Sequence, residues 1–308
     1  MKQRVSVRGR MAYKLVRFAT GMPVLGELIQ NGDLRRRMQG KERRWKCPSH
    51  LQWEKIPQKR FGMEYLHAKD KEMSQYVILQ LHGGGYYNRM RNKYREFAAL
   101  YYEVSGGMDV LTPDYRVAPE HRYPAALYDA CSAYIWLLKK GYQPEHIVLA
   151  GDSAGGGLAL ALIHYLKAYK LPIPGAVITM SAWTDLTKKG ESYRTNYWTD
   201  PVFGRRKKTL VYRKSYYQKN QPWNPYISPV KGDFKDFPAM LMQVGEYEML
   251  LSDTLEVVKK AKKQGVPVTL QVYKGMFHVF QMGELCYPES KRAWVQVGRF
   301  LRKWKKNN

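Results

Sequence analysis

The stretch Gly151-Asp152-Ser153-Ala154-Gly155 constrains the fold of this chain more than any other feature. The short apolar run Ile147–Ala150 precedes it, and the small and apolar residues Gly156–Leu160 follow directly. This order predicts a buried strand that turns at once into a helix, the layout of a nucleophile elbow. Such an elbow exposes the serine oxygen at the carboxyl edge of a sheet and places the next amide at a helix N-terminus. A lone G-x-S-x-G motif is only moderately specific, so a plain strand-to-helix turn is the alternative.

Three consecutive glycines form a second unusual feature, in the stretch His82-Gly83-Gly84-Gly85-Tyr86-Tyr87. They follow the apolar run Tyr76–Leu81, which reads as a buried strand. Because consecutive glycines cost conformational entropy, their presence indicates a backbone that approaches a ligand closely. A loop of this kind can offer amide donors to the oxyanion of a tetrahedral intermediate, and a flexible glycine turn is the alternative.

Three motifs resemble those of the hormone-sensitive-lipase-like branch of the α/β-hydrolase esterases, and they occur in the order found in that family. They are His82-Gly83-Gly84-Gly85, Asp114-Tyr115-Arg116-Val117-Ala118-Pro119-Glu120 and Gly151-Asp152-Ser153-Ala154-Gly155-Gly156. The resemblance extends from about Tyr76 to the C-terminus, and the segment before about residue 50 resembles only a variable N-terminal cap. It implies an α/β-hydrolase fold, with a mostly parallel sheet, helices on both faces and a helical cap, in a single domain over residues 1–308.

Alternating strand-like and helical patterns favour the same architecture. The strand-like runs are Tyr76–Leu81, Met108–Leu111, Ile147–Ala150, Ala176–Met180, Ala239–Val244 and Val268–Tyr273. Helical patterns include Ala125–Lys139, Gly156–Ala168, Ser252–Lys263 and Glu289–Lys305. Two segments, about 1–50 and 188–226, break the alternation and resemble cap elements that roof an active site. Surface helices without substrate contact are the alternative for both.

A histidine base should lie downstream of Ser153, because the triad order in such hydrolases is Ser, then Asp or Glu, then His. Five of the seven histidines precede the serine, and His164 lies within the helix that follows it. His278 remains, in a loop just after the alternating pattern Val268–Tyr273. The alternative for His278 is a structural loop histidine.

The acid of the triad is expected after the strand Ala239–Val244. By resemblance it corresponds to Glu248, where the family more usually has Asp. A buried carboxylate there fixes the tautomer of His278 and stabilises the imidazolium that forms during acylation. Glu246 and Asp253 compete for this role, and both are interpreted as surface or helix-start carboxylates.

The resemblance implies a serine esterase in which Ser153 is the nucleophile, His278 the general base and acid, and Glu248 the orienting carboxylate. The amides of Gly83, Gly84 and Ala154 are expected to hold the oxyanion. This chemistry requires no metal and no organic cofactor.

The substrate is expected to be a small-molecule carboxylic ester of short to medium chain length, a preference to which the family resemblance also points. Tyr86 and Tyr87 follow the glycine loop and are expected to contact the substrate. Aromatic residues of the second cap segment are expected near the same pocket: Tyr193, Tyr197, Trp198 and Phe203. If these rings crowd the acyl pocket, long chains should be excluded, because overfilling a packed site is costly. Aromatics that merely pack the cap onto the sheet are the alternative.

Other functional classes stay open on the sequence alone. A non-catalytic binding protein on the same fold is one, as in the plant gibberellin receptors, which lack the catalytic histidine. The presence of Ser153, Glu248 and His278 favours an enzyme. Amidase or lactonase activity would use the same triad, and fold-level analogy does not choose between these substrates.

The net charge of +26 is the feature that an esterase explains least. Basic residues concentrate in the N-terminal segment, in Arg205–Lys208 and in the tail Arg302–Lys306. Solvated basic faces or a weak attraction to anionic surfaces would account for them, whereas no recognised motif supports specific nucleic-acid binding. Three scattered cysteines, a poor signal-peptide core and the lack of a membrane-length apolar run favour a cytoplasmic protein. The oligomeric state stays unknown at this stage.

Overall fold

An eight-stranded sheet forms the centre of the computed structural model, which describes residues 4–30, 34, 37, 41–70, 72–205, 213–217 and 221–307. The strand order is β1-β2-β4-β3-β5-β6-β7-β8. β2 pairs antiparallel with β1 and β4, and all other neighbours are parallel. The strands are β1 Leu51–Pro57, β2 Gly62–Ala68, β3 Val77–Leu81, β4 Asp109–Asp114, β5 Ile147–Asp152, β6 Ala176–Met180, β7 Ala239–Gly245 and β8 Val268–Tyr273.

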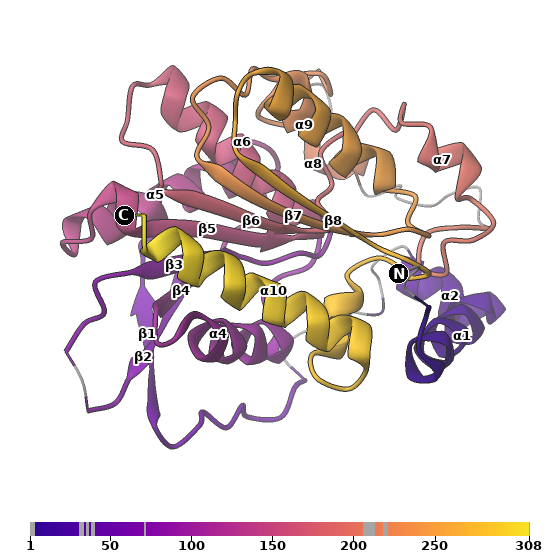
Figure 1. The fold of residues 1–308 in the computed structure, drawn as a ribbon, viewed down its shortest axis with the longest axis horizontal. Coiled ribbons are helices and arrows are strands. Elements are labelled where there is room, and N and C mark those ends of the chain that lie inside the picture. The colour runs from indigo at the N-terminus through magenta and orange to yellow at the C-terminus, as the bar shows by residue number, and fades with distance from the viewer. Residues whose placement is uncertain are drawn as a thin grey trace.

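Helices cover both faces of this sheet (Figure 1). α4 and α10 lie on one face, and α5, α6 and α9 lie on the other. The helices among the described residues are α1 Val7–Gly21, α2 Pro23–Gln30, α4 Asn92–Ser105, α5 Ala125–Lys139, α6 Ser153–Ala168, α7 Ser192–Thr195, α8 Arg213–Tyr217, α9 Leu251–Lys263 and α10 Pro288–Lys305, with 3-10 turns at Pro144–His146, Pro229–Lys231 and Phe280–Gly283. None of them combines the length and the apolar character that crossing a membrane requires.

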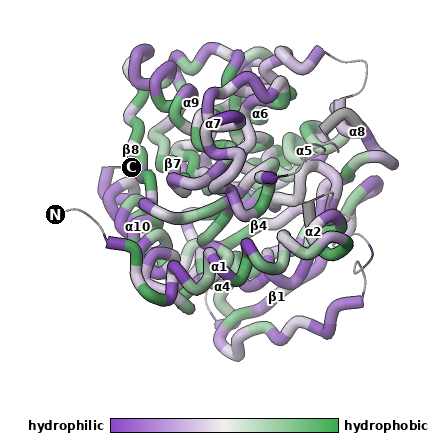
Figure 2. The backbone as a smooth tube through the Cα atoms, turned by 90° about the vertical axis from the view of Figure 1, so that its right-hand side faces the viewer, coloured by the Kyte–Doolittle hydropathy of each residue, from purple (hydrophilic) through white to green (hydrophobic). Residues whose placement is uncertain are grey.

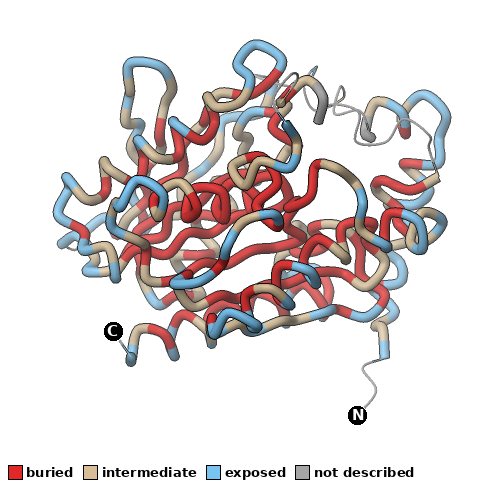
Figure 3. The backbone as a smooth tube through the Cα atoms, turned by 90° about the horizontal axis from the view of Figure 1, so that it is seen from above, coloured by how far each residue is buried: buried red, intermediate tan, exposed pale blue. Residues whose placement is uncertain are grey.

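Each face of the sheet has its own hydrophobic core, so the central strands β3 to β7 are buried on both sides (Figure 3). All five residues of β3 and all five of β6 are buried. Strands covered on both faces have near-continuous apolar sequences, which is why these runs stand out in the chain. The six strands predicted from such runs are all present, which confirms the predicted mostly parallel sheet with helices on both faces.

The two antiparallel strands β1 and β2 were not among the predicted strands. Only Leu51 is buried along β1, and the strand carries Glu54 and Lys55 on its way to Pro57. A strand at the edge of a sheet buries too little side-chain area to require an apolar run. The hydrophobic signal used for the other strands is therefore missing from β1. β2 lies between β1 and β4 and mixes the buried residues Met63, Tyr65 and Leu66 with Glu64 and His67, so it also lacks a continuous apolar run.

The first predicted cap segment contains α1 and α2. Both lie beyond the carboxyl ends of the parallel strands, on the opposite side of the molecule from the C-terminus (Figure 1). The backbone amide and hydroxyl of Ser6 donate to the two carboxylate oxygens of Glu289, at 2.7 and 2.8 Å. The Tyr13 hydroxyl donates to Thr199 O at 2.9 Å, so α1 also contacts the second cap segment. The second segment contains α7 and α8, and its basic residues Arg206, Lys207 and Lys208 lie outside the described residues.

Candidate active site

Ser153 stands at the sharp turn between β5 and α6, with a positive φ of 51°. The glycines on either side are required by close backbone contacts. A Cβ at Gly155 would lie 2.0 Å from Leu81 O, and a Cβ at Gly151 would lie 2.4 Å from Gly155 O. Neither contact is possible for a real side chain, so only glycine fits at these two positions. This is the geometry that the sequence predicted for the turn.

Ser153, His278 and Glu248 form a continuous chain of hydrogen bonds. His278 Nε2 lies 2.9 Å from Ser153 Oγ, and His278 Nδ1 lies 3.1 Å from Glu248 Oε2. The three side chains come from the turn after β5, the loop after β8 and the loop after β7. Parallel strands end at the same edge of a sheet, which brings residues 125 positions apart into contact.

Glu248 is completely buried, and a serine that the sequence analysis missed holds its second oxygen. Ser181 Oγ donates to Glu248 Oε1 at 2.7 Å, and the Gly245 amide donates to the same oxygen. Ser181 Oγ also accepts the amide of Val279, the residue next to His278, at 3.0 Å. A polar residue directly after the buried strand β6 is the signal that marks this position in the sequence.

Two further buried groups support the loop of Glu248. Asp200 accepts hydrogen bonds from the amides of Met249 at 2.7 Å and Phe203 at 3.0 Å. The pKa of Asp200 is raised overall, because the effect of burial exceeds the opposite effects of these hydrogen bonds and of His278. The Asn196 side chain donates to Glu248 O at 2.8 Å. Both residues belong to the irregular second cap segment, where no periodic pattern marks them.

The two competing carboxylates and His164 form hydrogen bonds with groups outside the chain of Ser153, His278 and Glu248. Glu246 accepts the amide of Gly275 at 2.9 Å, whereas the carboxylate bonded to His278 Nδ1 is that of Glu248. Asp253 lies in the first turn of α9 as expected, but it is buried instead of exposed, and burial raises its pKa well above the usual range. His164 Nε2 bonds Pro229 O at 3.0 Å on α6, and burial lowers the pKa of His164 to about 4.

The glycine loop differs in one respect from the prediction. The Gly83 amide donates to Asp152 Oδ1 at 2.9 Å, so this amide is already engaged, and Gly83 does not line the cavity at Ser153. Gly84 and Gly85 do line that cavity. Among the described residues, no hydrogen bond engages the amides of Gly84, Gly85 or Ala154. The Gly83 amide, predicted as an oxyanion donor, is therefore already engaged in this structure, and the amides of Gly84, Gly85 and Ala154 are the candidates that remain.

The second motif of the sequence supports this loop from behind. The Tyr115 hydroxyl donates to His82 O, and the two rings stack with centroids 4.0 Å apart. Asp114 accepts the amide of Met90 at 3.0 Å, just beyond the loop. The position of the loop is therefore fixed by the motif at the end of β4 as well as by the glycines of the loop.

A cavity of about 250 Å³ opens beside Ser153 and His278. Its lining includes Val16 and Thr20 of α1 and Phe203 of the second cap segment. Tyr86 and Tyr87 do not line it, and Tyr86 instead stacks on Tyr216 with ring centroids 3.9 Å apart. Of the aromatic residues expected to crowd the acyl pocket, the structure therefore places Phe203 at the cavity wall. Tyr86 is a packing residue in this structure.

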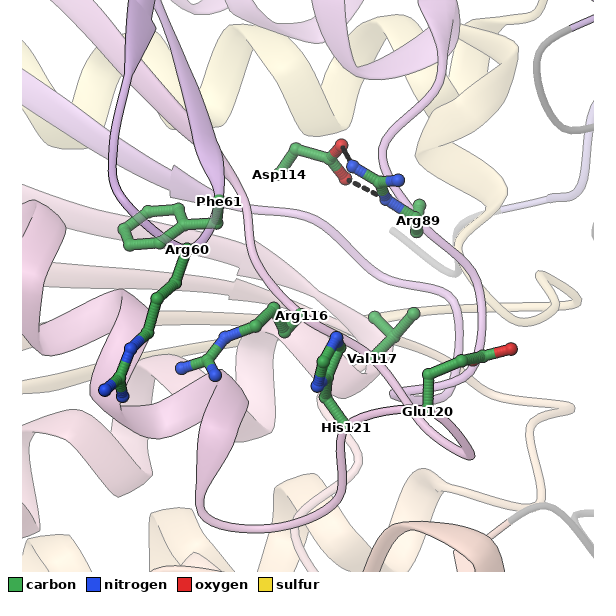
Figure 4. A pocket seen from close by; sticks show the side chains of 8 residues that line it. All are labelled: Arg60, Phe61, Arg89, Asp114, Arg116, Val117, Glu120 and His121. Carbon is green, nitrogen blue, oxygen red and sulfur yellow. Dashed lines mark hydrogen bonds and ion pairs between the residues drawn. The ribbon is translucent and has the colours of Figure 1, made fainter.

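A larger cavity of about 330 Å³ lies nearby but contains none of the three residues Ser153, His278 and Glu248 (Figure 4). Two of its arginines have carboxylate partners, because Arg89 pairs with Asp114 and Arg116 pairs with Asp129. Its lining is predominantly polar and basic: Arg60, Phe61, Arg89, Asp114, Arg116, Val117, Glu120 and His121. The hydrogen-bonded serine places the candidate active site at the smaller cavity.

Comparison with known proteins agrees with this fold. Residues 78–282 match the family described as the alpha/beta hydrolase fold, and the chain therefore belongs to that family. An acetyl-hydrolase of Streptomyces hygroscopicus is 36% identical over 226 residues, which cover 73% of this chain and 75% of the relative.

Two solved structures are similar over nearly the whole chain. One is an esterase from the bacterial hormone-sensitive lipase family, with a TM-score of 0.85 and 32% identity, covering 98% of this chain and 99% of that one. The other is EstE5 soaked by p-nitrophenyl butyrate, with a TM-score of 0.84 and 32% identity over 97% of this chain and 99% of that one. The family to which the sequence motifs pointed is thereby confirmed.

Proposed function

We propose that this protein is a serine carboxylic-ester hydrolase that acts on short- to medium-chain esters through an acyl-enzyme intermediate. The observation that carries this proposal is the hydrogen-bonded chain from Ser153 through His278 to Glu248, at the wall of a cavity. Membership of the family and similarity to esterases support it. The same chain of hydrogen bonds argues against the alternative of a non-catalytic binding protein, which has no use for an activated serine.

Acylation begins when Ser153 Oγ attacks the carbonyl carbon of the ester. His278 Nε2 accepts the serine proton, and the carbonyl oxygen becomes an oxyanion in the tetrahedral intermediate. The amides of Gly84, Gly85 and Ala154 stabilise this oxyanion by hydrogen bonds, the last of them with help from the N-terminus of α6. When the intermediate collapses, the C–O bond to the alcohol breaks and His278 returns the proton to the departing oxygen.

Deacylation uses the same groups with water as the nucleophile. His278 takes a proton from the water, whose oxygen attacks the acyl carbon, and then protonates Ser153 Oγ as the carboxylic acid leaves. Glu248 accepts a hydrogen bond from Nδ1–H throughout, which keeps Nε2 free to act as the base and stabilises the imidazolium. The buried position of Glu248 and the donors at its second oxygen fix the orientation of this carboxylate.

The preference for short chains rests on the cavity and its cap. A volume of about 250 Å³ lies below the range of pockets that bury drug-sized ligands, which is roughly 300–1,000 Å³. Val16 and Phe203 bring the segments 1–50 and 188–226 to the cavity wall, which supports their role as cap elements of a single domain. The acetyl-hydrolase relative and the butyrate ester soaked into EstE5 are consistent with short acyl groups.

The decisive experiment compares Ser153→Ala with Ser132→Ala, a serine that is exposed on α5. With p-nitrophenyl acetate, butyrate, octanoate and palmitate as substrates, the first variant should lose on the order of 10³-fold or more in kcat while keeping its fold. Ser132→Ala should match the parent protein. Near-normal turnover by folded Ser153→Ala would disprove the nucleophile, and a preference for palmitate would disprove the proposed chain length.

Lactone and amide substrates complete this panel, because the same triad can hydrolyse both. An ester kcat/KM well above the values for matched lactones and amides is the expected result. The opposite order would keep the mechanism and change the substrate class.

A further inference from the structure

The first helix, α1, exposes large apolar side chains on the face that points away from the protein. Val7, Met11, Leu15 and Phe18 are 63%, 63%, 69% and 67% exposed. They recur every three or four residues, the spacing of one face of a helix. The opposite face of α1 packs on the loop after β8, through Ala12, Tyr13 and Val16.

Basic residues border the exposed apolar face of α1. At about 100° per residue, the four exposed side chains project within an arc of about 80°. The exposed residues Arg8, Arg10, Lys14 and Arg17 border this arc, and the helix sequence contains no acidic residue. The outer face is therefore an apolar stripe between basic margins. Figure 2 shows that hydrophobic and hydrophilic residues alternate along α1.

The apolar surface continues beyond α1. Val24, in the first turn of α2, is 74% exposed. Trp198 is 68% exposed and belongs to the segment that α1 contacts, because Arg17 Nη1 donates to Trp198 O at 3.3 Å. Tryptophan and amphipathic helices with basic margins are both enriched where proteins meet the surface of a bilayer.

We propose that the outer face of α1 binds the surface of an anionic lipid bilayer, with the helix lying parallel to the membrane plane. Its apolar stripe would enter the boundary between headgroups and acyl chains, and its basic margins would contact anionic headgroups. A second copy of this chain fits the face less well, because pairing two such helices would bring their arginines and lysines together in a protein of net charge +26.

Membrane contact at this helix would place the bilayer beside the cavity. Val16 and Thr20 of the same helix line the cavity at Ser153. An ester dissolved in the membrane would then be presented next to the candidate nucleophile. The binding proposal itself does not depend on the catalytic assignment, because binding is measured without turnover.

The test is co-sedimentation of the full-length protein with vesicles of mixed phosphatidylglycerol and phosphatidylcholine, compared with vesicles of phosphatidylcholine alone. Strong partitioning onto the anionic vesicles and weak partitioning onto the neutral ones is the expected result. Leu15→Asn combined with Phe18→Asn should lower partitioning onto anionic vesicles by at least about tenfold. Circular dichroism and thermal unfolding verify that this variant keeps its fold.

Charge reversal provides the matched control. Arg10→Glu with Lys14→Glu should lower partitioning by about tenfold or more. Lys259→Glu with Lys263→Glu, two exposed residues on α9, removes the same formal charge elsewhere and should have a small effect. Equal losses for the two pairs would overturn the proposal, because they would show attraction by net charge alone.

Two other outcomes would also overturn it. Partitioning that Leu15→Asn with Phe18→Asn leaves unchanged would exclude α1 as the binding surface. A concentration-dependent dimer that the same double variant dissociates, without binding to vesicles by the parent protein, would assign the stripe to self-association. Sedimentation equilibrium over a range of protein concentrations measures this second outcome.

Discussion

Replacing Ser181 with alanine removes two hydrogen bonds behind the proposed triad without changing the cavity wall. Glu248 Oε1 would keep the Gly245 amide as a donor and lose the Ser181 hydroxyl, which now lies 2.7 Å away. The Val279 amide would lose the acceptor that now lies 3.0 Å away. Both hydrogen bonds are buried, so water does not replace the lost donor to Glu248 Oε1 or the lost acceptor of the Val279 amide.

The size of the effect follows from these two bonds. A hydrogen bond to a charged group contributes about 1.5–3 kcal/mol, and a buried amide without a partner costs about 1–3 kcal/mol. We therefore expect the free energy of unfolding to fall by about 2.5–6 kcal/mol, and Tm by roughly 4–9 °C. If the first bond orients Glu248 toward His278, kcat should fall by about ten- to a hundredfold, because each 1.36 kcal/mol changes a rate tenfold.

The measurement is kcat and KM for p-nitrophenyl butyrate, together with thermal unfolding, at a temperature where both proteins are folded. KM should change little, because Ser181 does not line the cavity. Ser290→Ala is the matched control, since it removes another buried serine hydroxyl that donates to Gln281 O at 3.2 Å. A Ser181→Ala protein that loses stability but retains the parent kcat would refute a role for Ser181 in positioning the acid.

Three further predictions test the acid, a buried histidine and the turn. Glu248→Gln should lower kcat far more than Glu246→Gln, measured with the same ester, because Glu248 is the carboxylate that contacts His278; the reverse order would assign the wrong acid. Because His164 has a pKa of about 4 when folded and about 6.5 when unfolded, the unfolded chain binds more protons between these values. Stability should therefore be fully present above about pH 6.5 and fall by up to about 3 kcal/mol toward pH 4. Urea unfolding of His164→Gln, which keeps a donor for Pro229 O, should show a smaller loss over this interval, and an unchanged loss would rule out His164 as its source. Gly155→Ala should abolish folding or activity, because its Cβ would lie 2.0 Å from Leu81 O, whereas Gly62→Ala meets nothing within 4 Å and should be tolerated in both solubility and activity assays.

The sequence predicted most accurately the elements with a regular pattern of apolar residues. Three elements begin and end at the predicted residues: β6, which is buried along its whole length, the edge strand β8, whose apolar and polar residues alternate, and α5. Burial on two sides requires long apolar runs, and an amphipathic helix repeats its apolar residues regularly, so both leave a clear pattern. The edge strand β1 leaves no such pattern, because only Leu51 is buried along it and its pairing with β2 depends on backbone hydrogen bonds.

The site was predicted where a residue follows directly from its place after a strand. Ser153 and His278 are of this kind, and the structure places Ser153 Oγ 2.9 Å from His278 Nε2. Which amide of the glycine loop is engaged could not be predicted, because the bond from Gly83 to Asp152 joins residues that are 69 positions apart. The same holds for Tyr86, whose ring turns toward Tyr216 because of tertiary packing.

The contact between Ser6 and Glu289 has a consequence for how the protein is made. These residues are 283 positions apart, so the helix that is synthesised early cannot reach its partner until the last helix has left the ribosome. The sheet and the residues around Ser153 can assemble before that point, since a domain acquires its long-range contacts as the chain becomes available. Val16 and Thr20 then arrive with α1 as the last part of the cavity wall. The wall of the cavity is therefore completed only after Glu289 has been synthesised and α1 has packed against it.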